Sequence, residues 1–445
     1  METLQKNTSL DVANRARRSL SRSEEYWTRA KGLIPAGTQT FSKGPTQYVD
    51  GVAPKYLVRG HGSHVWDVDG NEYIDYAMGL GAVSLGYGYP AVTEAIRRQL
   101  NDGMSFSLMH PLEVEVSELF RELVPCAQMV RFGKHGSDVT TAAVRVARAY
   151  TGREVVLHCG YHGWHDWYIG STSRRRGVPQ ATIKLQQGFP YNDLEALERR
   201  LEEFRGRVAA VIMEPVGVTL PAPGYLQGVR TLASRHGAVF ILDEVATGFR
   251  FRLGGIHTEF GVEPDLVCFG KGIANGMPLS VLAGRADIMR LFEEVFFSFT
   301  FGGECLSLAA CLATLQEMRA RNTFAHVRRI GARLQDGYNR LARELGLGAY
   351  TQCVGLPPRT VVTFKDVQGR DSLLMKSVFQ QEVIKRGVLV SAVHCLSYSH
   401  SEPDIDATLE VYRHGLEVLS RGIAGDTLDS LLEGRPVQPV FRVIQ

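Results

Sequence analysis

Short apolar runs alternate with amphipathic stretches between about residues 112 and 300 of the chain. Five of the runs are continuous and read EVVLHC, VAAVIMEP, AVFILDEV, DLVCFG and SVLAGR. Continuous apolar runs are typical of strands that are covered on both faces, whereas the stretches between them repeat with the helical period. Because strands joined through helices run parallel, the pattern predicts an α/β fold with a mostly parallel sheet.

The chain before this region shows two further patterns. SRSEEYWTRAKGLIPAG predicts a helix that opens on a serine cap and ends before Pro35. SHVWDVDGNEYIDYAMG alternates apolar and polar positions around Asp69-Gly70, which predicts a β-hairpin. We expect the N-terminal hairpin to join a domain formed by the C-terminal part of the chain.

The helices lengthen after about residue 306, as in NTFAHVRRIGARLQDGYNRLARELG, and later strands such as RTVVTF stand apart. This change is typical of a smaller α+β domain. We therefore expect a large domain over residues 81–325 and a small domain over residues 326–445, with residues 1–80 contributing to the small domain.

Composition and charge exclude several classes of protein. Hydrophobic residues make up 44% of the chain and charged residues 22%, as in globular proteins, and the net charge is only +3. Apart from the triplet Arg174–Arg176 there is no Lys/Arg block, so nucleic acid is not an expected partner. The seven scattered cysteines lack the spacing of zinc or redox sites. No apolar stretch has the length of a signal peptide or membrane span, which predicts a soluble, cytoplasmic protein without membrane contact.

Candidate chemistry lies directly after the apolar runs, where open α/β sheets bind ligands. Lys271 follows one run between two glycines, and Asp243 ends another. A lysine drawn into such a site loses hydration and can form a Schiff base with a carbonyl. Alone, Lys271 would be read as a solvated lysine and Asp243 as a helix cap. Together they are the two groups that pyridoxal phosphate (PLP) requires, one for its aldehyde and one for its ring nitrogen.

Two more segments fit the same cofactor. Gly136 and Ser137 begin an amphipathic helix, whose free N–H groups favour a phosphate, although the same residues also suit an ordinary helix cap. In CGYHGWHDWY, glycines flank Tyr161 and His162, so the tyrosine ring can lie against a flat ligand. His162 and His165 have a spacing that metal ligands can show, but no third ligand stands nearby, and no metal is expected.

The motifs around Lys271 (FGKGIANGMPLSVLAGR), Asp243 (LDEVATGFR), Tyr161 (YHGWHD), Glu214 (IMEPV) and Thr300 (FTFGGE) together resemble the class III aminotransferases of PLP fold type I. The resemblance extends over residues 25–420. Within that family the chain is most similar to glutamate-1-semialdehyde 2,1-aminomutase, through AKGLIPAGTQTFSKGP, VWDVDGNEYIDYAMGLGAVSLGYGYP and PYNDLEAL.

The resemblance implies a role for each matching residue. Lys271 would bind PLP as a Schiff base and move the proton, and Asp243 would pair with the ring nitrogen. Tyr161 and Val245 would cover the two faces of the ring, and Glu214 would also contact the cofactor. The phosphate would be held by Gly136, Ser137 and a Thr300 donated by a second subunit, which implies a homodimer.

Departures from the family pattern concern the substrate above all. The usual Ser-Gly-Thr-Glu phosphate motif is replaced by HGSD, so His135 and Asp138 replace the serine and the glutamate. Leu80 stands where the aminomutase has a tryptophan that shapes the pocket, which suggests more room. Lys43 replaces a carboxylate-binding arginine, giving a point charge in place of a bidentate fork.

Three functional hypotheses follow. The first is an aminotransferase that moves an amino group from an amino-acid donor to an aldehyde or keto acceptor by a ping-pong mechanism. The second is the aminomutase itself, and the third is a non-catalytic scaffold, against which the presence of Lys271 and Asp243 argues. Trp164 offers a flat face for a sugar or base, and Arg174–Arg176 offer forks for phosphate oxygens, although a tryptophan packed in the core and a solvated basic face are the alternative interpretation. We therefore expect a larger anionic acceptor, such as a phosphorylated or nucleotide-linked keto sugar.

Overall fold

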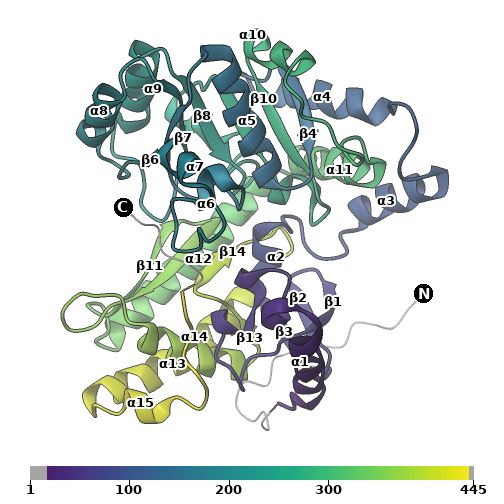
Figure 1. Cartoon of the computed structure of the whole chain (residues 1–445). Coiled ribbons are helices and arrows are strands. Elements are labelled where there is room, and N and C mark those ends of the chain that lie inside the picture. Colours follow the sequence, from purple (N-terminus) through teal and green to yellow (C-terminus); the bar gives the residue numbers. More distant parts are fainter. Residues whose placement is uncertain (1–17, 440–445) are drawn as a thin grey trace. The chain divides into compact units, whose positions relative to one another are not determined.

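The computed structural model describes residues 18–439, and the chain divides into two compact units (Figure 1). Unit 2 comprises the described residues from 79 to 326, and unit 1 comprises those up to 78 and from 327 onward. Two helices reach across these boundaries, namely α2 (Met78–Gly81) and α12 (Thr323–Glu344).

A seven-stranded sheet forms the centre of the described part of unit 2. In spatial order its strands are β4 (Met129–Gly133), β10 (Ser280–Gly284), β9 (Leu266–Phe269), β8 (Val239–Glu244), β7 (Val208–Met213), β5 (Val155–Cys159) and β6 (Gln186–Gly188). The strands from β9 to β6 are parallel, and β10 runs antiparallel to both β9 and β4. The predicted α/β architecture with a mostly parallel sheet is confirmed.

Helices cover this sheet because the stretches between its strands are amphipathic. The helix α5 (Gly136–Thr151) packs on β4, β7, β8, β9 and β10. The other helical segments of unit 2 are α3 (Pro90–Asp102), α4 (Pro111–Leu123), α6 (Asp166–Ile169), α7 (Gln180–Lys184), α8 (Leu194–Glu203), α9 (Tyr225–Arg235), η4 (Ile256–Phe260), η5 (Lys271–Ala274), α10 (Ala286–Met289), η6 (Arg290–Glu293) and α11 (Cys305–Arg321).

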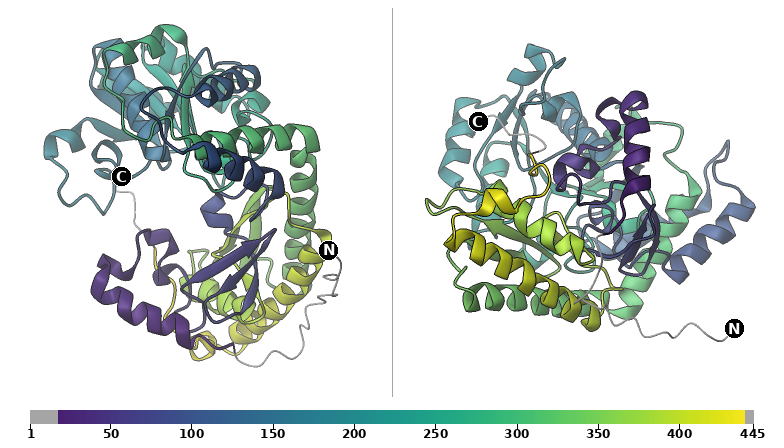
Figure 2. Two further views of the ribbon diagram at one scale, coloured as in Figure 1. Left: turned by 90° about the vertical axis from the view of Figure 1, so that its right-hand side faces the viewer. Right: turned by 90° about the horizontal axis from the view of Figure 1, so that it is seen from below.

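Unit 1 combines two small sheets with long helices. The N-terminal strands β1 (Leu57–His61), β2 (His64–Asp67) and β3 (Glu72–Asp75) form a sheet with the C-terminal strand β13 (Val388–Leu389), which pairs with β3 (Figure 2). The second sheet contains β11 (Thr351–Leu356), β12 (Arg359–Phe364) and β14 (Val393–Cys395). The helical segments are α1 (Ser21–Leu33), η1 (Pro35–Gly37), η2 (Phe41–Lys43), η3 (Pro45–Gln47), α13 (Leu373–Lys385), α14 (Glu402–Ala424) and α15 (Leu428–Leu431).

The expected serine cap of the first helix is wrong. No side chain of Leu20, the residue before α1, caps the helix. The carboxylate of Asp69, in the turn of the β2–β3 hairpin, instead accepts hydrogen bonds from the backbone N–H groups of Arg22 (2.8 Å) and Ser23 (2.9 Å). Asp69 therefore satisfies two of the free N–H groups at the start of this helix. Because Asp69 is far from the helix in the sequence, the local sequence pattern does not predict this contact.

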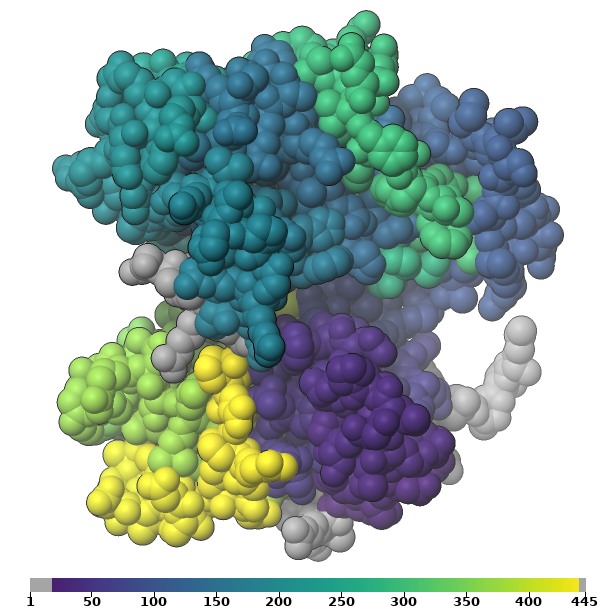
Figure 3. All heavy atoms as spheres, viewed as in Figure 1, coloured from purple at the N-terminus to yellow at the C-terminus, as the bar shows by residue number. Residues whose placement is uncertain are grey.

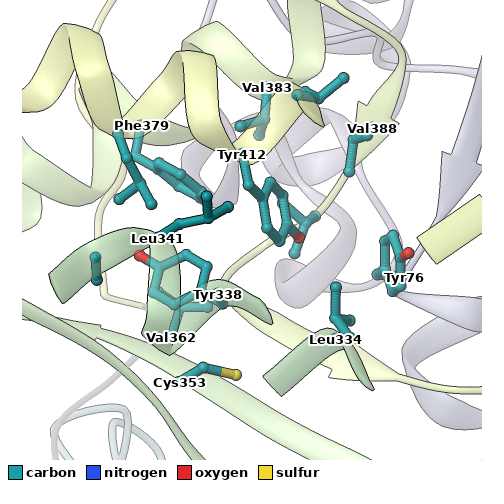
Figure 4. Packing of buried hydrophobic residues seen from close by; sticks show 14 of the residues in the cluster. Tyr76, Leu334, Tyr338, Leu341, Cys353, Val362, Phe379, Val383, Val388 and Tyr412 are labelled. Carbon is teal, nitrogen blue, oxygen red and sulfur yellow. The ribbon is translucent and has the colours of Figure 1, made fainter. Parts of the chain in front are cut away.

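An aromatic cluster forms the centre of unit 1 (Figure 4). The ring of Tyr338 on α12 meets Phe379 on α13 and Tyr412 on α14 edge-on, with centroids 5.8 and 5.7 Å apart. Such pairs contribute roughly 0.5–1.5 kcal/mol each beyond area burial. The Tyr338 hydroxyl forms a 2.6 Å hydrogen bond with Thr351, so the polar end of this buried ring is satisfied.

Within residues 18–439, no helix is long and apolar enough to cross a membrane. The same part of the chain contains no group of three or more His, Cys, Asp or Glu side chains that could hold a metal ion.

Candidate active site

The last residues of β5, β7, β8 and β9 are aligned by the strand pairing, so the segments that follow them lie side by side at one edge of the sheet. In spatial order these segments carry Tyr161, Glu214, Asp243 and Lys271. Residues far apart in the sequence thus meet at the carboxyl edge, where open α/β sheets bind ligands.

Asp243 is the penultimate residue of β8 and is 3% exposed. Its Oδ1 accepts a hydrogen bond from the backbone N–H of Val245 (3.0 Å), and its Oδ2 lies 2.8 Å from Nδ1 of His162. An ionised carboxylate only accepts hydrogen bonds, so the proton of this contact belongs to His162. Two donors therefore orient the charged form of Asp243.

His162 is held inside an aromatic cage. Its ring stacks on Trp167, with centroids 6.0 Å apart, and meets Tyr168 edge-on at 5.3 Å. Its Nε2 is buried and has no hydrogen-bond partner among the described residues. Because a proton on Nε2 would place an unsatisfied donor in this cage, the geometry selects the tautomer with hydrogen on Nδ1 alone.

Lys271 is the first residue of η5 and has a φ of 47°, in the left-handed region. Such a conformation costs a non-glycine residue of order 1–3 kcal/mol and persists only where its surroundings fix it. Asn275 supplies part of this support through its Oδ1, which accepts from the N–H groups of Ser84 (3.0 Å) and Leu85 (2.8 Å). The Ser84 hydroxyl in turn donates to the Gly272 carbonyl at 2.6 Å.

The loop between β4 and α5 forms a cradle at the same edge. The Asp138 carboxylate accepts from the backbone N–H groups of Lys134 (3.0 Å) and His135 (2.7 Å), which shapes the loop and leaves the N-terminus of α5 at Gly136 and Ser137. A side chain at Gly136 would place its Cβ 2.7 Å from Cγ1 of Val245. Only glycine permits this close approach.

The electrostatic character of the edge is acidic. Burial and the Asp243 carboxylate raise the pKa of Glu214, while His162, the Tyr161 N–H group and Lys271 act in the opposite direction. Burial, followed by Asp243 and Glu214, also raises the pKa of the Tyr161 phenol. The backbone N–H of Tyr161 donates to Oε2 of Glu214 at 2.9 Å. The Asp243 carboxylate therefore favours a ligand that carries positive charge on its ring, whereas the raised pKa of Glu214 favours the neutral form of that side chain.

The remaining predicted residues take more varied positions. The Tyr161 ring is 46% exposed, which leaves a face open to a ligand, and Trp164 is 67% exposed beside His165. Thr300 is exposed in the turn before α11. Leu80 is half-buried with a φ of 61° inside the left-handed turn of α2.

Lys43, the other predicted substrate residue, is exposed at the end of η2 in unit 1, whereas the cluster around Asp243 is built entirely from unit 2. Its role stays a prediction.

Sequence reasoning missed several supporting residues. His162 was considered only as a metal ligand, although its place directly after Tyr161 at a strand end was a usable signal. Glu244, fully buried below the edge, accepts from the N–H groups of Ile256 and His257, both at 2.9 Å. Nδ1 of His257 lies 2.6 Å from Oε1 of Glu244. No sequence pattern pairs Glu244 with a histidine 13 residues away.

These residues fit PLP. The carboxylate of Asp243 lies at the end of β8, Lys271 begins the segment after the neighbouring strand β9, and the helix N-terminus at Gly136 lies against Val245. PLP offers one group for each: a ring nitrogen that is protonated in its reactive form, an aldehyde and a phosphate. When bound, PLP supplies an electron sink.

Comparisons with known proteins agree with this geometry. The family pattern "Aminotransferase class-III" matches residues 48–349. The 3-aminobutyryl-CoA aminotransferase of Cloacimonas acidaminovorans is 34% identical over 407 residues, which cover 89% of this chain and 97% of that protein. The glutamate-1-semialdehyde 2,1-aminomutase of Roseiflexus castenholzii is 35% identical over 418 residues, covering 87% and 95%.

Solved structures share the fold. The FumI protein of Sphingopyxis sp. MTA144, solved with PLP, has a TM-score of 0.86 at 26% identity, covering 94% of this chain and 99% of FumI. An omega-transaminase from Sphaerobacter thermophilus has a TM-score of 0.82 at 27% identity, covering 90% and 98%.

Proposed function

This chain belongs to the class III aminotransferases, which use PLP, and we propose that it transfers an amino group to a carbonyl acceptor larger and more anionic than glutamate 1-semialdehyde. It is a PLP-dependent aminotransferase, and its donor and acceptor are small molecules that react in turn at one site. The proposal concerns which acceptor it takes and which residues do the work.

Within the site, we propose that Lys271 binds the cofactor covalently and carries the proton during transfer. Asp243, held by His162 and Val245, keeps the ring nitrogen protonated. Tyr161 and Val245 cover the ring, Glu214 contacts it, and Gly136 and Ser137 donate N–H groups to the phosphate. The convergence of these residues on one sheet edge supports the assignment.

The segment after Tyr161 carries the argument for a large anionic acceptor. Arg174, Arg175 and Arg176 are all exposed, in the turn between α6 and α7. An exposed run of guanidinium groups in the chain segment that leaves a cofactor site can bind phosphate oxygens of a substrate. Trp164 and Tyr161 present exposed rings from the same segment, which suit a sugar or a base.

The relative from Cloacimonas points in the same direction. Its name gives an amino compound, 3-aminobutyryl-CoA, as its substrate. Because transamination is reversible, the matching carbonyl compound is also a thioester of coenzyme A, which is a nucleotide that carries several phosphate charges. We therefore extend the acceptor class to nucleotide-linked carbonyl compounds in general, with keto sugars as one case.

The aminomutase remains the second candidate, because relatives with that name match the chain at 35% identity over most of its length. Against it stand Leu80 and Lys43, which replace the tryptophan and the arginine expected for the small substrate. Turnover of glutamate 1-semialdehyde without any second substrate would favour this candidate.

We also propose a homodimer in which Thr300 reaches the phosphate of the partner's cofactor. Large exposed apolar side chains gather on two segments, with Phe106, Leu108 and Met109 on one and Phe296, Phe299 and Phe301 on the other. The segments adjoin, because the Cys305 N–H donates to the Met104 carbonyl at 2.8 Å; Figure 3 shows the blue and green chain regions in contact. Such a patch favours a protein partner, and it surrounds Thr300.

Half-reactions test the acceptor class. The purified holoenzyme is first treated with a panel of amino donors and then with carbonyl acceptors, while the visible spectrum of the cofactor is followed. We expect phosphorylated or nucleotide-linked ketones to restore the original spectrum, and small keto acids to do so weakly. Efficient turnover of glutamate 1-semialdehyde alone would contradict the proposal.

An arginine variant sharpens the test. Replacing Arg174, Arg175 and Arg176 by alanine should raise the KM of the acceptor and leave the donor half-reaction intact, because only the acceptor carries phosphate. The matched control removes Arg199, Arg200 and Arg205, which lie on or just after α8, are exposed or half-buried, and pair with glutamates. Equal effects of both variants would remove the triplet from the site.

A further inference from the structure

Three basic residues of the β4–α5 region hold the segment Phe296–Glu304, which precedes α11. Arg131 on β4 donates to the Phe297 carbonyl, and Arg145 on α5 donates to the Phe296 carbonyl at 3.0 Å. Lys134, two residues before Gly136, forms an ion pair with Glu304 at 2.9 Å. The strand β4 and the helix α5 therefore hold one end of the segment, and Lys134 in the loop between them holds the other end.

The Lys134–Glu304 pair differs from an ordinary surface ion pair. The two side chains are only 13% and 14% exposed. Oε2 of Glu304 also accepts from the Ser307 hydroxyl (2.6 Å), and its Oε1 accepts from the Leu306 N–H (2.7 Å), so the carboxylate caps α11 as well. These hydrogen bonds hold the Glu304 carboxylate in one arrangement, which makes its ion pair with Lys134 a rigid connection.

The Lys134–Glu304 ion pair connects two regions of the protein that have different proposed roles. On one side, the Lys134 backbone N–H donates to Asp138, which shapes the cradle at Gly136. On the other side, the segment carries Thr300 and the exposed rings of Phe296, Phe299 and Phe301, which belong to the proposed dimer surface. Lys134 and Glu304 thus connect the segment at that surface to the cradle.

We propose that Lys134 and Glu304 are positioning residues that couple phosphate binding in one subunit to association with the second. The coupling rests on the homodimer proposed above. A phosphate bound in the cradle at Gly136 fixes the β4–α5 loop. The ion pair then fixes the segment Phe296–Glu304 in the conformation that the second subunit binds. By linkage, association stabilises the cradle to the same extent.

The test measures dimer dissociation with and without PLP, by sedimentation of the purified protein at decreasing concentration. In the wild type, PLP should tighten the dimer by roughly 5–150-fold, the usual range of coupling between sites. Lys134→Met keeps the aliphatic stem but removes the charge, and we expect the ratio between the two dissociation constants to fall below the wild-type value, while the direct contact of Thr300 with the phosphate in the second subunit keeps it above one. Faster loss of PLP from the same variant is the reciprocal effect.

Further variants make the result decisive. Lys134→Arg keeps the charge and should keep the wild-type ratio, and Glu304→Gln should behave like Lys134→Met. The double variant should add little to either, because both changes remove the same contact. Lys365→Met, which removes an exposed ion pair with Asp371 in unit 1, is the control. An unchanged ratio in Lys134→Met would overturn the coupling alone, whereas a monomeric wild type would overturn the dimer.

Discussion

At the scale of single residues, Lys271 is the residue whose loss has the simplest consequence. Lys271→Ala removes the amine that binds the cofactor and carries the proton, so the variant should bind PLP without the visible absorbance of the lysine-bound form and should not transfer amino groups. Absorbance and activity of the purified variant check both effects. Turnover near the wild-type rate would show that another group does this work.

His162 offers a finer test of the same site. His162→Phe keeps an aromatic ring in the cage but removes the donor to Asp243, and His162→Asn returns a donor close to the position of Nδ1. We expect a roughly 10–100-fold loss of kcat in the first variant, as for other partners that orient a functional group. The second variant should recover part of it. A pH titration of the cofactor spectrum separates this effect from simple misfolding, and identical titrations in all three proteins would exclude the assigned role.

At the scale of elements, a histidine fastens the N-terminal hairpin of unit 1 to α14. Nδ1 of His64 lies 2.9 Å from Glu72 of β3, and its Nε2 lies 3.0 Å from Asp404 of α14. Burial opposes protonation of His64, but the hydrogen bonds and charges of Asp404 and Glu72 outweigh it and raise its pKa. Burial would raise the pKa of Asp404, but hydrogen bonds from His64 and Ser401 hold it well below its usual range.

These shifts define a pH window for the stability of unit 1. A histidine whose pKa is raised by folding contributes its full stabilisation at pH values below its pKa in the unfolded chain, and this contribution is lost as the pH rises through its pKa in the folded protein. An aspartate whose pKa is lowered by folding contributes its stabilisation at pH values above its pKa in the unfolded chain. The contact should therefore contribute most between about pH 4 and 6.5. His64→Gln should lose about 1.5 kcal/mol there and less above neutral pH.

Urea unfolding of both proteins from acid to alkaline pH measures this difference. Gln cannot be charged, so the difference between the two proteins reports His64 together with the acidic partners whose titration it changes, Asp404 above all. A difference that stays constant across this range would show that the charge of His64 does not stabilise the fold.

At the scale of the whole molecule, the homodimer predicts complementation between damaged subunits. Thr300→Ala weakens phosphate binding at the partner's site, and Lys271→Ala inactivates its own site. A mixed dimer then has one intact site and one site with both lesions, so mixing should restore activity at low PLP concentration that neither parent shows. Each variant refolded alone is the control. No gain on mixing would place Thr300 in its own subunit's site.

The sequence alone determined the α/β class and the cofactor chemistry of this protein. Continuous apolar runs are typical of strands that are covered on both faces, and their alternation with helices predicts parallel pairing, which holds from β9 to β6 but not for β10. Lys271 and Asp243 each follow such a run, so their place at the carboxyl edge followed from local pattern. The family resemblance came from motifs of the same kind, which lie at strand ends.

Only the tertiary structure decided which side chains support these residues. The contacts of His162 with Asp243, Lys134 with Glu304 and Asp69 with the start of α1 join residues 81, 170 and about 47 positions apart. Hydrogen bonds and ion pairs form wherever the fold brings partners together, and they leave no periodic trace in the sequence. The periodicity of apolar residues therefore predicts the helices and strands, whereas the hydrogen bonds and ion pairs between side chains depend on how these elements pack.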